Sequence, residues 1–314
     1  MSKTVTVVLV QSRPVYMNLE ASLAKAVAQI GEAASRGAQL VVFGETWLAG
    51  YPAWLDYCPD AALWNHEPTK QVFARLRQNS IVVPSAETEI LANAAAENKV
   101  TVVIGVNERV VKGAGNGTLY NSLLTFSSEG KLVNHHRKLV PTFTERLVWG
   151  HGDADGLEAV DTSAERVGGL VCWEHWMPLA RQAMHNAGEQ IHVSVFPTVH
   201  EMHQIASRHY AFEGRCFVLT VGLIMPVKDL PAELNTPAEL AQNPDHLILR
   251  GGSAVIAPDG RYVAGPVYDE EIILIAEIDL SEVDKEKMTL DVSGHYQRPD
   301  VFELSLKKGS RIKS

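Results

Sequence analysis

The sequence predicts a single α/β domain in which two β-sheets pack face to face between two outer layers of helices, a four-layer αββα sandwich. Short runs of β-branched apolar residues alternate along the chain with segments whose apolar residues have helical spacing. The runs are apolar at nearly every position, which is typical of strands covered on both faces. No linker rich in proline, glycine or serine interrupts the 314 residues. We therefore expect one domain over residues 1–306 and a short, polar, frayed tail over residues 307–314.

The first half of the chain begins with a strand, a helix and a second strand. The apolar run Val5–Val10 is short, as expected of a buried strand. Apolar residues spaced from Leu19 to Ala34 predict a helix, with Asn18 as its N-cap and Gly37 beyond its end. Similar patterns predict strand Gln39–Phe43, helix Ser85–Asn98, strand Val100–Gly105, and a hairpin of Leu119–Phe126 with Lys131–His136.

The second half repeats this alternation. The run Val167–Cys172 predicts a strand, and Pro178–Asn186 predicts a helix with proline at its start and Gly188 past its end. The patterns that follow predict strand Ile191–Phe196, helix Glu201–Gly214, strand Phe217–Gly222, strands Ser253–Ala257 and Tyr262–Ala264, and strand Ile272–Ile278. Buried strands in such numbers need helices on their outer faces, which the predicted segments supply.

The composition argues against several classes of function. The formal net charge is −9, and the 28 basic and 37 acidic residues are interspersed along the chain. An acidic chain without a basic patch is a poor candidate for binding nucleic acid. No apolar stretch approaches the ~20 residues of a membrane helix, and the N-terminal apolar run is too short for a signal peptide. Three cysteines are too few for a disulfide framework, so we expect a cytoplasmic protein.

Cys172 is the cysteine that we interpret as a nucleophile. It ends the predicted strand Val167–Cys172 and precedes the polar, aromatic turn Trp173–Met177, after which a helix is expected. A residue at such a turn lies at the edge of a sheet, near backbone N–H groups that can receive an oxyanion. Cys216 begins an apolar run and is expected in the core. Cys58 lies in an aromatic loop, where it is expected to be structural but could also line a pocket.

A nucleophilic cysteine needs a base or a nearby positive charge, because a thiol with a pKa of ~8.5 is mostly protonated at neutral pH. Glu45 and Lys138 each follow a predicted strand, and Cys172 ends one. Singly, such a Glu or Lys is usually a solvated surface residue. Together, the three reactive groups at strand ends make a more specific pattern, in which Glu45 and Lys138 are candidates for the base and the positive charge.

Three blocks of the sequence resemble, in order, those of the nitrilase (carbon–nitrogen hydrolase) family. The blocks are Val-Val-Phe-Gly-Glu45-Thr-Trp-Leu-Ala-Gly-Tyr-Pro, His-Arg-Lys138-Leu-Val-Pro-Thr-Phe-Thr-Glu145-Arg and Gly-Gly-Leu-Val-Cys172-Trp-Glu-His-Trp-Met-Pro-Leu. The resemblance spans nearly the whole chain. It implies a catalytic Glu45–Lys138–Cys172 triad with Glu145 as a second glutamate of the site. One departure is Gly44, where many members of the family have proline.

The resemblance also implies a reaction and an assembly. Cys172-Trp-Glu after the strand, and Asp291-Val-Ser-Gly-His-Tyr-Gln-Arg-Pro-Asp300 near the end, are similar to nitrilases rather than to amidases or carbamoylases. A nitrilase converts an organic nitrile into a carboxylic acid and ammonia through a cysteine thioimidate and an acyl thioester. The family fold is the αββα sandwich, without a metal or an organic cofactor, in homodimers that often build spiral filaments. We expect the segment Asp291–Leu306 to contribute to such an interface.

Aromatic residues near the three blocks are candidates for contact with substrate, and their grouping favours an aryl, arylaliphatic or otherwise apolar nitrile. With one histidine of the Cys172 turn, these candidates are Tyr51, Trp54, Trp149, Trp173, His175, Trp176 and Phe196.

Four other interpretations are weighed against this one. An amidase or carbamoylase would use the same triad, and a non-catalytic filament protein would keep the fold. A Cys-His-Asn hydrolase would need His175 or His209 beside Cys172, but a histidine three residues after the cysteine cannot easily reach its thiol. His200 and His203 are three residues apart, whereas the zinc-protease motif needs four, so we expect no metal site there.

Overall fold

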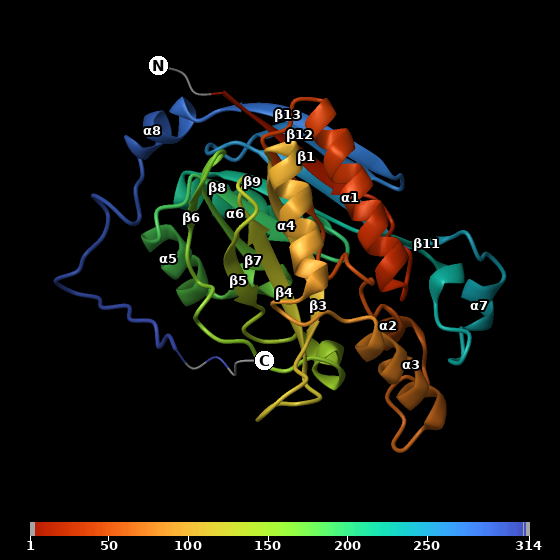
Figure 1. Cartoon of the computed structure of the whole chain (residues 1–314). Coiled ribbons are helices and arrows are strands. Elements are labelled where there is room, and N and C mark those ends of the chain that lie inside the picture. Colours follow the sequence, from red (N-terminus) through yellow and green to blue (C-terminus); the bar gives the residue numbers. More distant parts are fainter. Residues whose placement is uncertain (1–3, 310, 312–314) are drawn as a thin grey trace.

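Two β-sheets pack face to face in the computed structural model, which describes residues 4–309 and 311 (Figure 1). The first sheet has the strand order β13-β1-β2-β3-β4-β5. Neighbours β1, β2 and β3 are parallel, and the other neighbouring pairs are antiparallel. The bounds are β1 Thr4–Gln11, β2 Leu40–Phe43, β3 Thr101–Arg109, β4 Leu119–Phe126, β5 Leu132–Arg137 and β13 Ile272–Asp279.

The second sheet has the order β10-β11-β9-β8-β7-β6, with β12 paired to β11. Its centre consists of the parallel strands β7, β8 and β9. The bounds are β6 Val160–Thr162, β7 Glu165–Val171, β8 Ile191–Val195, β9 Phe217–Val221, β10 Ile224–Pro226, β11 Leu247–Ile256 and β12 Tyr262–Tyr268.

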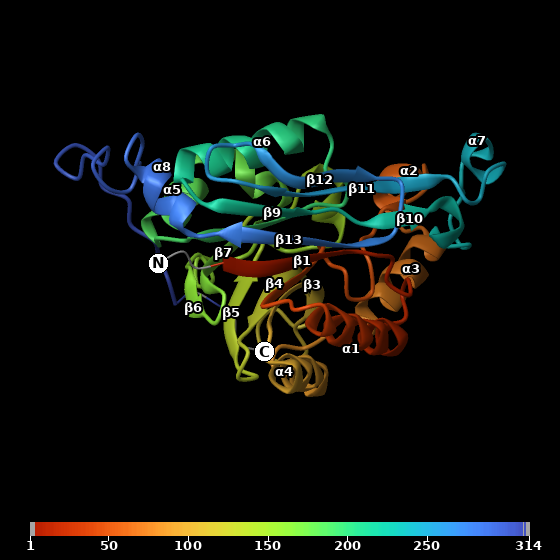
Figure 2. The ribbon, with the colours of Figure 1, turned by 90° about the horizontal axis from the view of Figure 1, so that it is seen from above.

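Helices cover the outer face of each sheet (Figure 2). Helices α1 (Leu19–Ser35) and α4 (Ala86–Asn98) lie on the first sheet, and α5 (Pro178–Asn186) and α6 (Glu201–Gly214) lie on the second. Apolar clusters fill the space between helices and sheet on both sides, and a third fills the space between the sheets, with Val7, Val42 and Val193 among its members. This layering confirms the predicted αββα sandwich.

Local sequence explains where the main helices begin. The Asn18 side chain accepts the Ala21 N–H at 3.1 Å, as predicted for the cap of α1. Ser85 precedes α4 in a capping box with Thr88, in which each side chain bonds the backbone of the other. These polar caps satisfy backbone N–H groups that have no partner within the helix.

The structure differs from the predicted elements in both strands and helices. Strands β6 and β10 were not predicted, and β3 continues beyond Gly105 to Arg109. Strand β7 ends at Val171, because Cys172 has a φ of +54° that a strand cannot accommodate. Strands β11 and β12 extend well beyond their predicted bounds. Four helices were not predicted, because they are short or bury few apolar residues; they are α2 (Trp54–Tyr57), α3 (Glu67–Gln78), α7 (Ala238–Ala241) and α8 (Ser281–Lys287).

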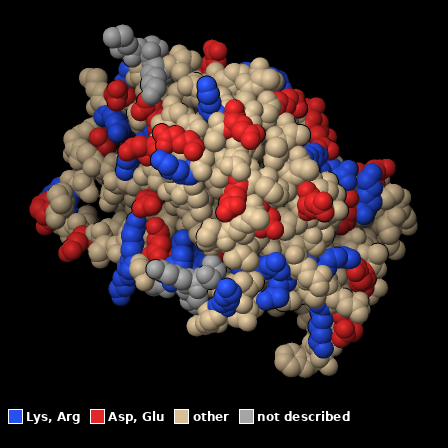
Figure 3. Space-filling view, viewed as in Figure 1, with Lys and Arg blue, Asp and Glu red and all other residues tan. Residues whose placement is uncertain are grey.

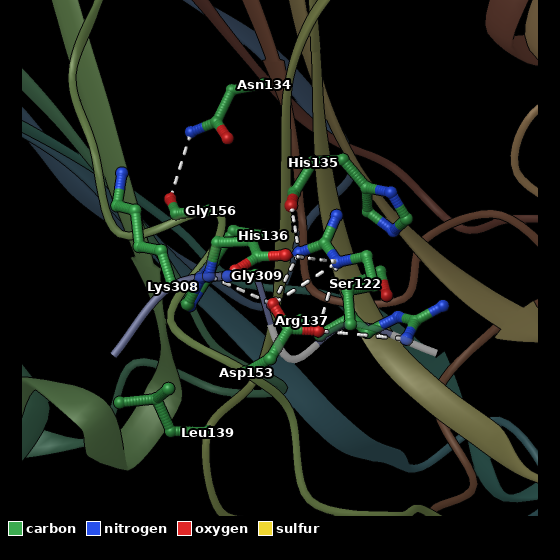
Figure 4. Close-up of polar contacts among 12 residues, drawn as sticks. Ser122, Asn134, His135, His136, Arg137, Leu139, Asp153, Gly156, Lys308 and Gly309 are labelled. Atoms are coloured by element: carbon green, nitrogen blue, oxygen red, sulfur yellow. Dashed lines mark hydrogen bonds and ion pairs between the residues drawn. The ribbon is translucent and has the colours of Figure 1, made fainter. Parts of the chain in front are cut away.

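The surface and the C-terminal segment complete the description. Acidic and basic side chains are interspersed on the face shown in Figure 3. No helix among the described residues is both long and apolar enough to cross a membrane. Of the predicted tail, residues 310 and 312–314 lie outside the described ones. Within the described part, Lys308 Nζ lies 2.9 Å from Glu158, and Arg311 bonds Asp153. Figure 4 shows this region, with Arg137 beside Asp153.

Candidate active site

Three strand ends come together at one place between the two sheets. Glu45 lies two residues after β2, and Lys138 lies directly after β5, so both belong to the first sheet. Cys172 lies directly after β7, in the second sheet. All three side chains are buried. The predicted trio therefore lies together, contributed by both halves of the sandwich.

Lys138 lies between two carboxylates. Its Nζ is 3.1 Å from Glu45 Oε1 and 2.6 Å from Glu145 Oε2. Oxygen atoms of both carboxylates and the Cys172 sulfur lie within 4.8 Å of one another. The ammonium group thus supplies the positive charge in a buried cluster of two acids and a thiol, where charges interact more strongly than in water. Burial alone would lower the pKa of Lys138, but the neighbouring acidic groups outweigh it and raise that pKa.

Glu45 keeps one oxygen available for proton transfer. Its Oε1 accepts hydrogen bonds from Asn121 Nδ2, at 2.7 Å, and from Lys138. Its Oε2 is buried and has no hydrogen-bond partner within residues 4–309 and 311. Burial raises the pKa of Glu45 to about 7, in spite of the nearby Lys138, and Glu145 adds to the rise. A carboxylate with such a pKa can accept and return a proton near neutral pH.

The turn that carries Glu45 is closely packed. Glycine at position 105, on β3, lets that strand approach the backbone of the turn, since a Cβ atom there would overlap the Gly44 carbonyl oxygen. A Cβ atom at Gly44 would lie 2.5 Å from Leu223 Cδ2, so a larger residue there would require the Leu223 side chain to shift. Many members of the family have proline at this position. Here the space is limited, and Gly44 fits it.

Glu145 is held by several donors besides Lys138. The Tyr51 hydroxyl donates to Glu145 Oε1 at 2.9 Å, and the Thr142 N–H donates to Oε2 at 2.7 Å. Glu145 lies in the short 3-10 helix Phe143–Leu147 and is buried. Its carboxylate therefore has little freedom to move, which suits a group that holds Lys138 in place.

Cys172 begins the 3-10 helix Cys172–Trp176 in a left-handed conformation. Its side chain is 4% exposed, and it lines a cavity. Burial raises the pKa of the Cys172 thiol, and Glu45 raises it further, while Lys138 and the Trp173 N–H oppose the rise. The thiol therefore needs a base to release its proton, and Glu45 is the nearby group suited to that task.

Glu174 connects the backbone around the nucleophile to the backbone around the lysine. Its Oε1 accepts the Leu139 N–H at 2.8 Å, and its Oε2 accepts the Val171 N–H at 2.7 Å. Sequence reasoning recognised this glutamate only as part of the family block and gave it no role. The signal in the sequence was an acidic residue directly within the turn that carries the nucleophile.

A cavity of about 330 Å³ opens above the thiol. Of the residues expected to contact substrate, Tyr51 and Trp173 line it, and so do Glu145 and Cys172. The other residues of its wall are Asp56, Tyr57, Thr142, Phe143, Thr144, Pro197, Thr198, His200, His203, Ile248 and Leu249. His200 and His203 thus lie beside the cavity.

The remaining candidates for substrate contact do not line this cavity. Trp54 is packed in the core, and Trp149 is buried behind Tyr51, with its Nε1 donating to Asn107. Phe196 is also fully buried, and Trp176 lines a neighbouring surface hollow. His175 is buried, with its Nδ1 2.7 Å from the Cys172 carbonyl oxygen. These residues were named for their proximity in sequence to the blocks, which does not decide which way a side chain faces.

Residues 6–287 match the model of the carbon–nitrogen hydrolase family. The chain is 41% identical over 298 residues to an aliphatic nitrilase of Sinorhizobium fredii strain HH103, covering 94% of this chain and 93% of that protein. It is 36% identical over 308 residues to a bifunctional nitrilase/nitrile hydratase of Lupinus angustifolius, covering 97% and 86%. The crystal structure of a carbon–nitrogen hydrolase from Helicobacter pylori G27 has a similar fold, with a TM-score of 0.72, 19% identity and coverage of 95% and 97%.

Proposed function

The chain belongs to the carbon–nitrogen hydrolase family, and we propose that it is a nitrilase, which hydrolyses an organic nitrile to a carboxylic acid and ammonia. The observation that carries this proposal is the buried thiol of Cys172 beside Glu45, Lys138 and Glu145, at the base of a cavity. Relatives named as nitrilases, 36% and 41% identical over nearly the whole chain, support the nitrile as the substrate rather than the amide.

In the first step, Cys172 Sγ attacks the nitrile carbon. The S–C bond forms, and the electron pair of one carbon–nitrogen π bond moves to nitrogen. Glu45 accepts the thiol proton and transfers a proton to that nitrogen, which leaves a neutral thioimidate. Lys138 and the Trp173 N–H stabilise the negative charge that develops during the attack.

Hydrolysis completes the cycle. Water adds to the thioimidate carbon while Glu45 accepts one of its protons, and a tetrahedral intermediate forms. The nitrogen, once protonated, leaves as ammonia, and the remaining C–O bond becomes the carbonyl of an acyl thioester. A second water attacks this carbonyl, releases the carboxylic acid and returns the proton to the thiol. Glu145 holds Lys138 in position throughout.

We infer that the substrate is an apolar nitrile. Much of the cavity wall is apolar or aromatic: Tyr57, Phe143, Trp173, Pro197, Ile248 and Leu249. A cavity of about 330 Å³ is at the small end of the range for small-molecule sites.

The test is a panel of aromatic, arylaliphatic and aliphatic nitriles, each with its matched amide, with acid, amide and ammonia quantified. We expect acid and ammonia from at least one apolar nitrile, and none from the Cys172→Ala variant. Mass spectrometry with a slow substrate should find the covalent adduct on Cys172. Ammonia from amides but not from nitriles would make the protein an amidase. An adduct on Cys58 or Cys216 would refute the assignment of the nucleophile.

We further propose that the protein is cytoplasmic and assembles into homodimers and larger oligomers or filaments. Three free cysteines, all buried, support a reducing compartment. The segment Asp291–Leu306 supports the assembly, because Tyr296, Val301 and Phe302 are more than half exposed there. Truncation after Leu290 should lower the mass measured by light scattering and lower activity, and truncation before Lys307 should do much less. A full-length protein that is monomeric and fully active at nanomolar concentration would contradict the assembly.

A further inference from the structure

A chain of buried hydrogen bonds runs from the backbone of the nucleophile into the second sheet. His175 Nδ1 lies 2.7 Å from the Cys172 carbonyl oxygen, and His175 Nε2 lies 2.9 Å from His192 Nε2. His192 Nδ1 lies 2.7 Å from Glu189 Oε2, and the Tyr210 hydroxyl donates to Glu189 Oε1. All of these side chains are nine-tenths or more buried. Neither the proposed mechanism nor the substrate cavity uses them.

The partners determine where the protons lie. A carbonyl oxygen can only accept, so His175 Nδ1 must carry the hydrogen that bonds Cys172. Burial lowers the pKa of His175 to about 3, so its ring is neutral and its Nε2 accepts. His192 Nε2 must then donate. The remaining contact, between His192 Nδ1 and Glu189, contains one further proton, which either partner can hold.

The location of that proton follows from the burial of both partners. Burial lowers the pKa of His192 well below its ordinary range, and burial raises the pKa of Glu189 to about 7. Both directions favour the neutral pair, in which Glu189 donates its proton to His192 Nδ1. Every polar atom along the chain then has a partner of the correct kind, as a buried network requires.

The Cys172 carbonyl belongs to the same peptide group as the Trp173 N–H. A trans peptide is planar, and its C=O and N–H point in opposite directions. His175 binds the carbonyl and does not line the cavity, so the N–H of the same peptide points in the opposite direction, away from His175. This N–H favours the thiolate and opposes the rise in the pKa of Cys172 that burial causes. The orientation of this donor therefore depends on the His175 hydrogen bond, because Cys172 has a left-handed φ of +54° that few residues adopt unaided.

We propose that His175 is a positioning residue, which holds the Cys172–Trp173 peptide so that its N–H faces the reacting sulfur, and that His192 and Glu189 keep His175 in the required tautomer. This role rests on the proposed function and deepens it, since His175 touches neither the substrate cavity nor the thiol. Ring packing restricts His175 further, with its ring centroid 5.2 Å from that of Phe196 and 5.6 Å from that of Tyr210.

The decisive comparison is between His175→Asn and His175→Gln. The asparagine amide nitrogen occupies the place of Nδ1 and can still donate to the Cys172 carbonyl, whereas the glutamine amide nitrogen corresponds to Nε2. In His175→Gln we expect kcat to fall by about tenfold to a hundredfold with KM within about threefold, because a small misplacement of a reacting group costs that much. In His175→Asn we expect kcat to be higher than in His175→Gln, with at least half of the decrease in log kcat restored. Equal losses in both variants would overturn the proposal, and so would full activity of His175→Gln.

A second measurement does not depend on nitrile turnover. The rate at which iodoacetamide alkylates Cys172, followed by mass spectrometry across pH, reports the ionisation of the thiol in the presence of unchanged Glu45, Lys138 and Glu145. Loss of the Trp173 N–H donor should move the midpoint upward by about one pH unit in His175→Gln but not in His175→Asn. An unmoved midpoint in His175→Gln would refute the positioning role. A wild-type protein without nitrilase activity would instead refute the proposed function, and the two failures are thus distinguishable.

Two variants of Glu189 test whether this residue, through His192, keeps His175 in the required tautomer. A glutamine there supplies an N–H to His192 Nδ1 and an oxygen to Tyr210, so Glu189→Gln should alkylate with the wild-type pH profile. Glu189→Met supplies neither group and should shift the profile in the direction of His175→Gln. Thermal unfolding of each variant identifies any that fail to fold. If folded Glu189→Gln and Glu189→Met behave alike, the role assigned to the neutral Glu189 is wrong.

Discussion

Glu174 and His136 form a buried contact between the two sheets, with Glu174 Oε2 2.9 Å from His136 Nε2. The same carboxylate accepts the N–H of Leu139, which follows Lys138, and the N–H of Val171, which precedes Cys172. Burial disfavours the charged carboxylate, but His136 and these two backbone donors outweigh it and lower the pKa of Glu174. One ionised side chain thus sets the distance between the backbones that carry the lysine and the nucleophile.

Glu174→Gln should weaken both stability and activity. An amide NH₂ would face one of the backbone donors, so a buried hydrogen bond would be lost and a donor left without a partner. We expect the free energy of unfolding to fall by about 2 kcal/mol, and kcat to fall at least about tenfold because Lys138 and Cys172 shift relative to each other. Urea unfolding and steady-state kinetics measure the two effects. Glu129→Gln, in an exposed pair with Lys131, is the matched control and should change neither. Unaltered kcat in Glu174→Gln would contradict the positioning role.

Lys138→Ala and Glu45→Gln should each lower kcat by several orders of magnitude. Removal of one donor to a developing anion can alone cost ~10²–10³, and Glu45 is also expected to accept protons in two steps. The exposed Lys131→Ala variant provides the matched control, with an expected kcat equal to that of the wild type. Circular dichroism should confirm that the variants fold. The proposed roles could not stand if either variant retained activity within tenfold of the wild type.

The pH dependence of kcat/KM should show the ionisation of Glu45. Burial raises the pKa of Glu45 to about 7, and the carboxylate must be deprotonated to accept the thiol proton. Activity should therefore rise with pH through an apparent pKa near 7, which belongs to the coupled Glu45–Lys138–Cys172 group rather than to one residue. Initial rates at low substrate concentration between about pH 5 and pH 9 measure this limb. A flat profile across that range would exclude Glu45 as the base with this pKa.

Acid should destabilise the fold through Glu108. Burial raises the pKa of this carboxyl, but hydrogen bonds from His135 and Arg137 outweigh burial and lower the pKa to about 2. A carboxyl with a lowered folded-state pKa stabilises the protein fully above its unfolded pKa, and this stability is lost as the pH falls toward 2. The contribution is on the order of 3 kcal/mol. Denaturant unfolding between about pH 6 and pH 3 should show the decline, and Glu108→Gln should be less stable at neutral pH with a flatter dependence. An equally steep decline in Glu108→Gln would assign the effect to other carboxylates, such as Glu213.

The reactive residues were predictable because their signals are local. Glu45 and Cys172 each lie at the end of an apolar run, and Lys138 follows the more polar strand that ends in His135-His136-Arg137. Strand ends lie at sheet edges. The family blocks then assigned the three to one site. The layered fold was predictable for a similar reason, since buried strands and amphipathic helices have distinct periods.

The walls of the cavity were not predictable in the same way. Trp54 lies two residues beyond the first family block and Trp173 belongs to the third, but Trp54 packs in the core and Trp173 lines the cavity. Their directions depend on two short segments, α2 and the 3-10 helix after β7, which carry no clear periodic pattern. Ile248 and Leu249 reach the cavity from β11, distant in sequence from every block. Contacts of this kind follow from tertiary packing and leave no local signal.

Glu45 and Lys138 come from one sheet and Cys172 from the other. The rate of turnover therefore depends on the position of the two sheets relative to each other. A slip of about 1 Å between them would separate base from nucleophile while the hydrogen bonds within each sheet persisted. On gradual heating or with added urea, catalysis should thus disappear at milder conditions than the circular dichroism of the strands. The gap between the two midpoints would measure how firmly the interior apolar layer joins the halves of the molecule.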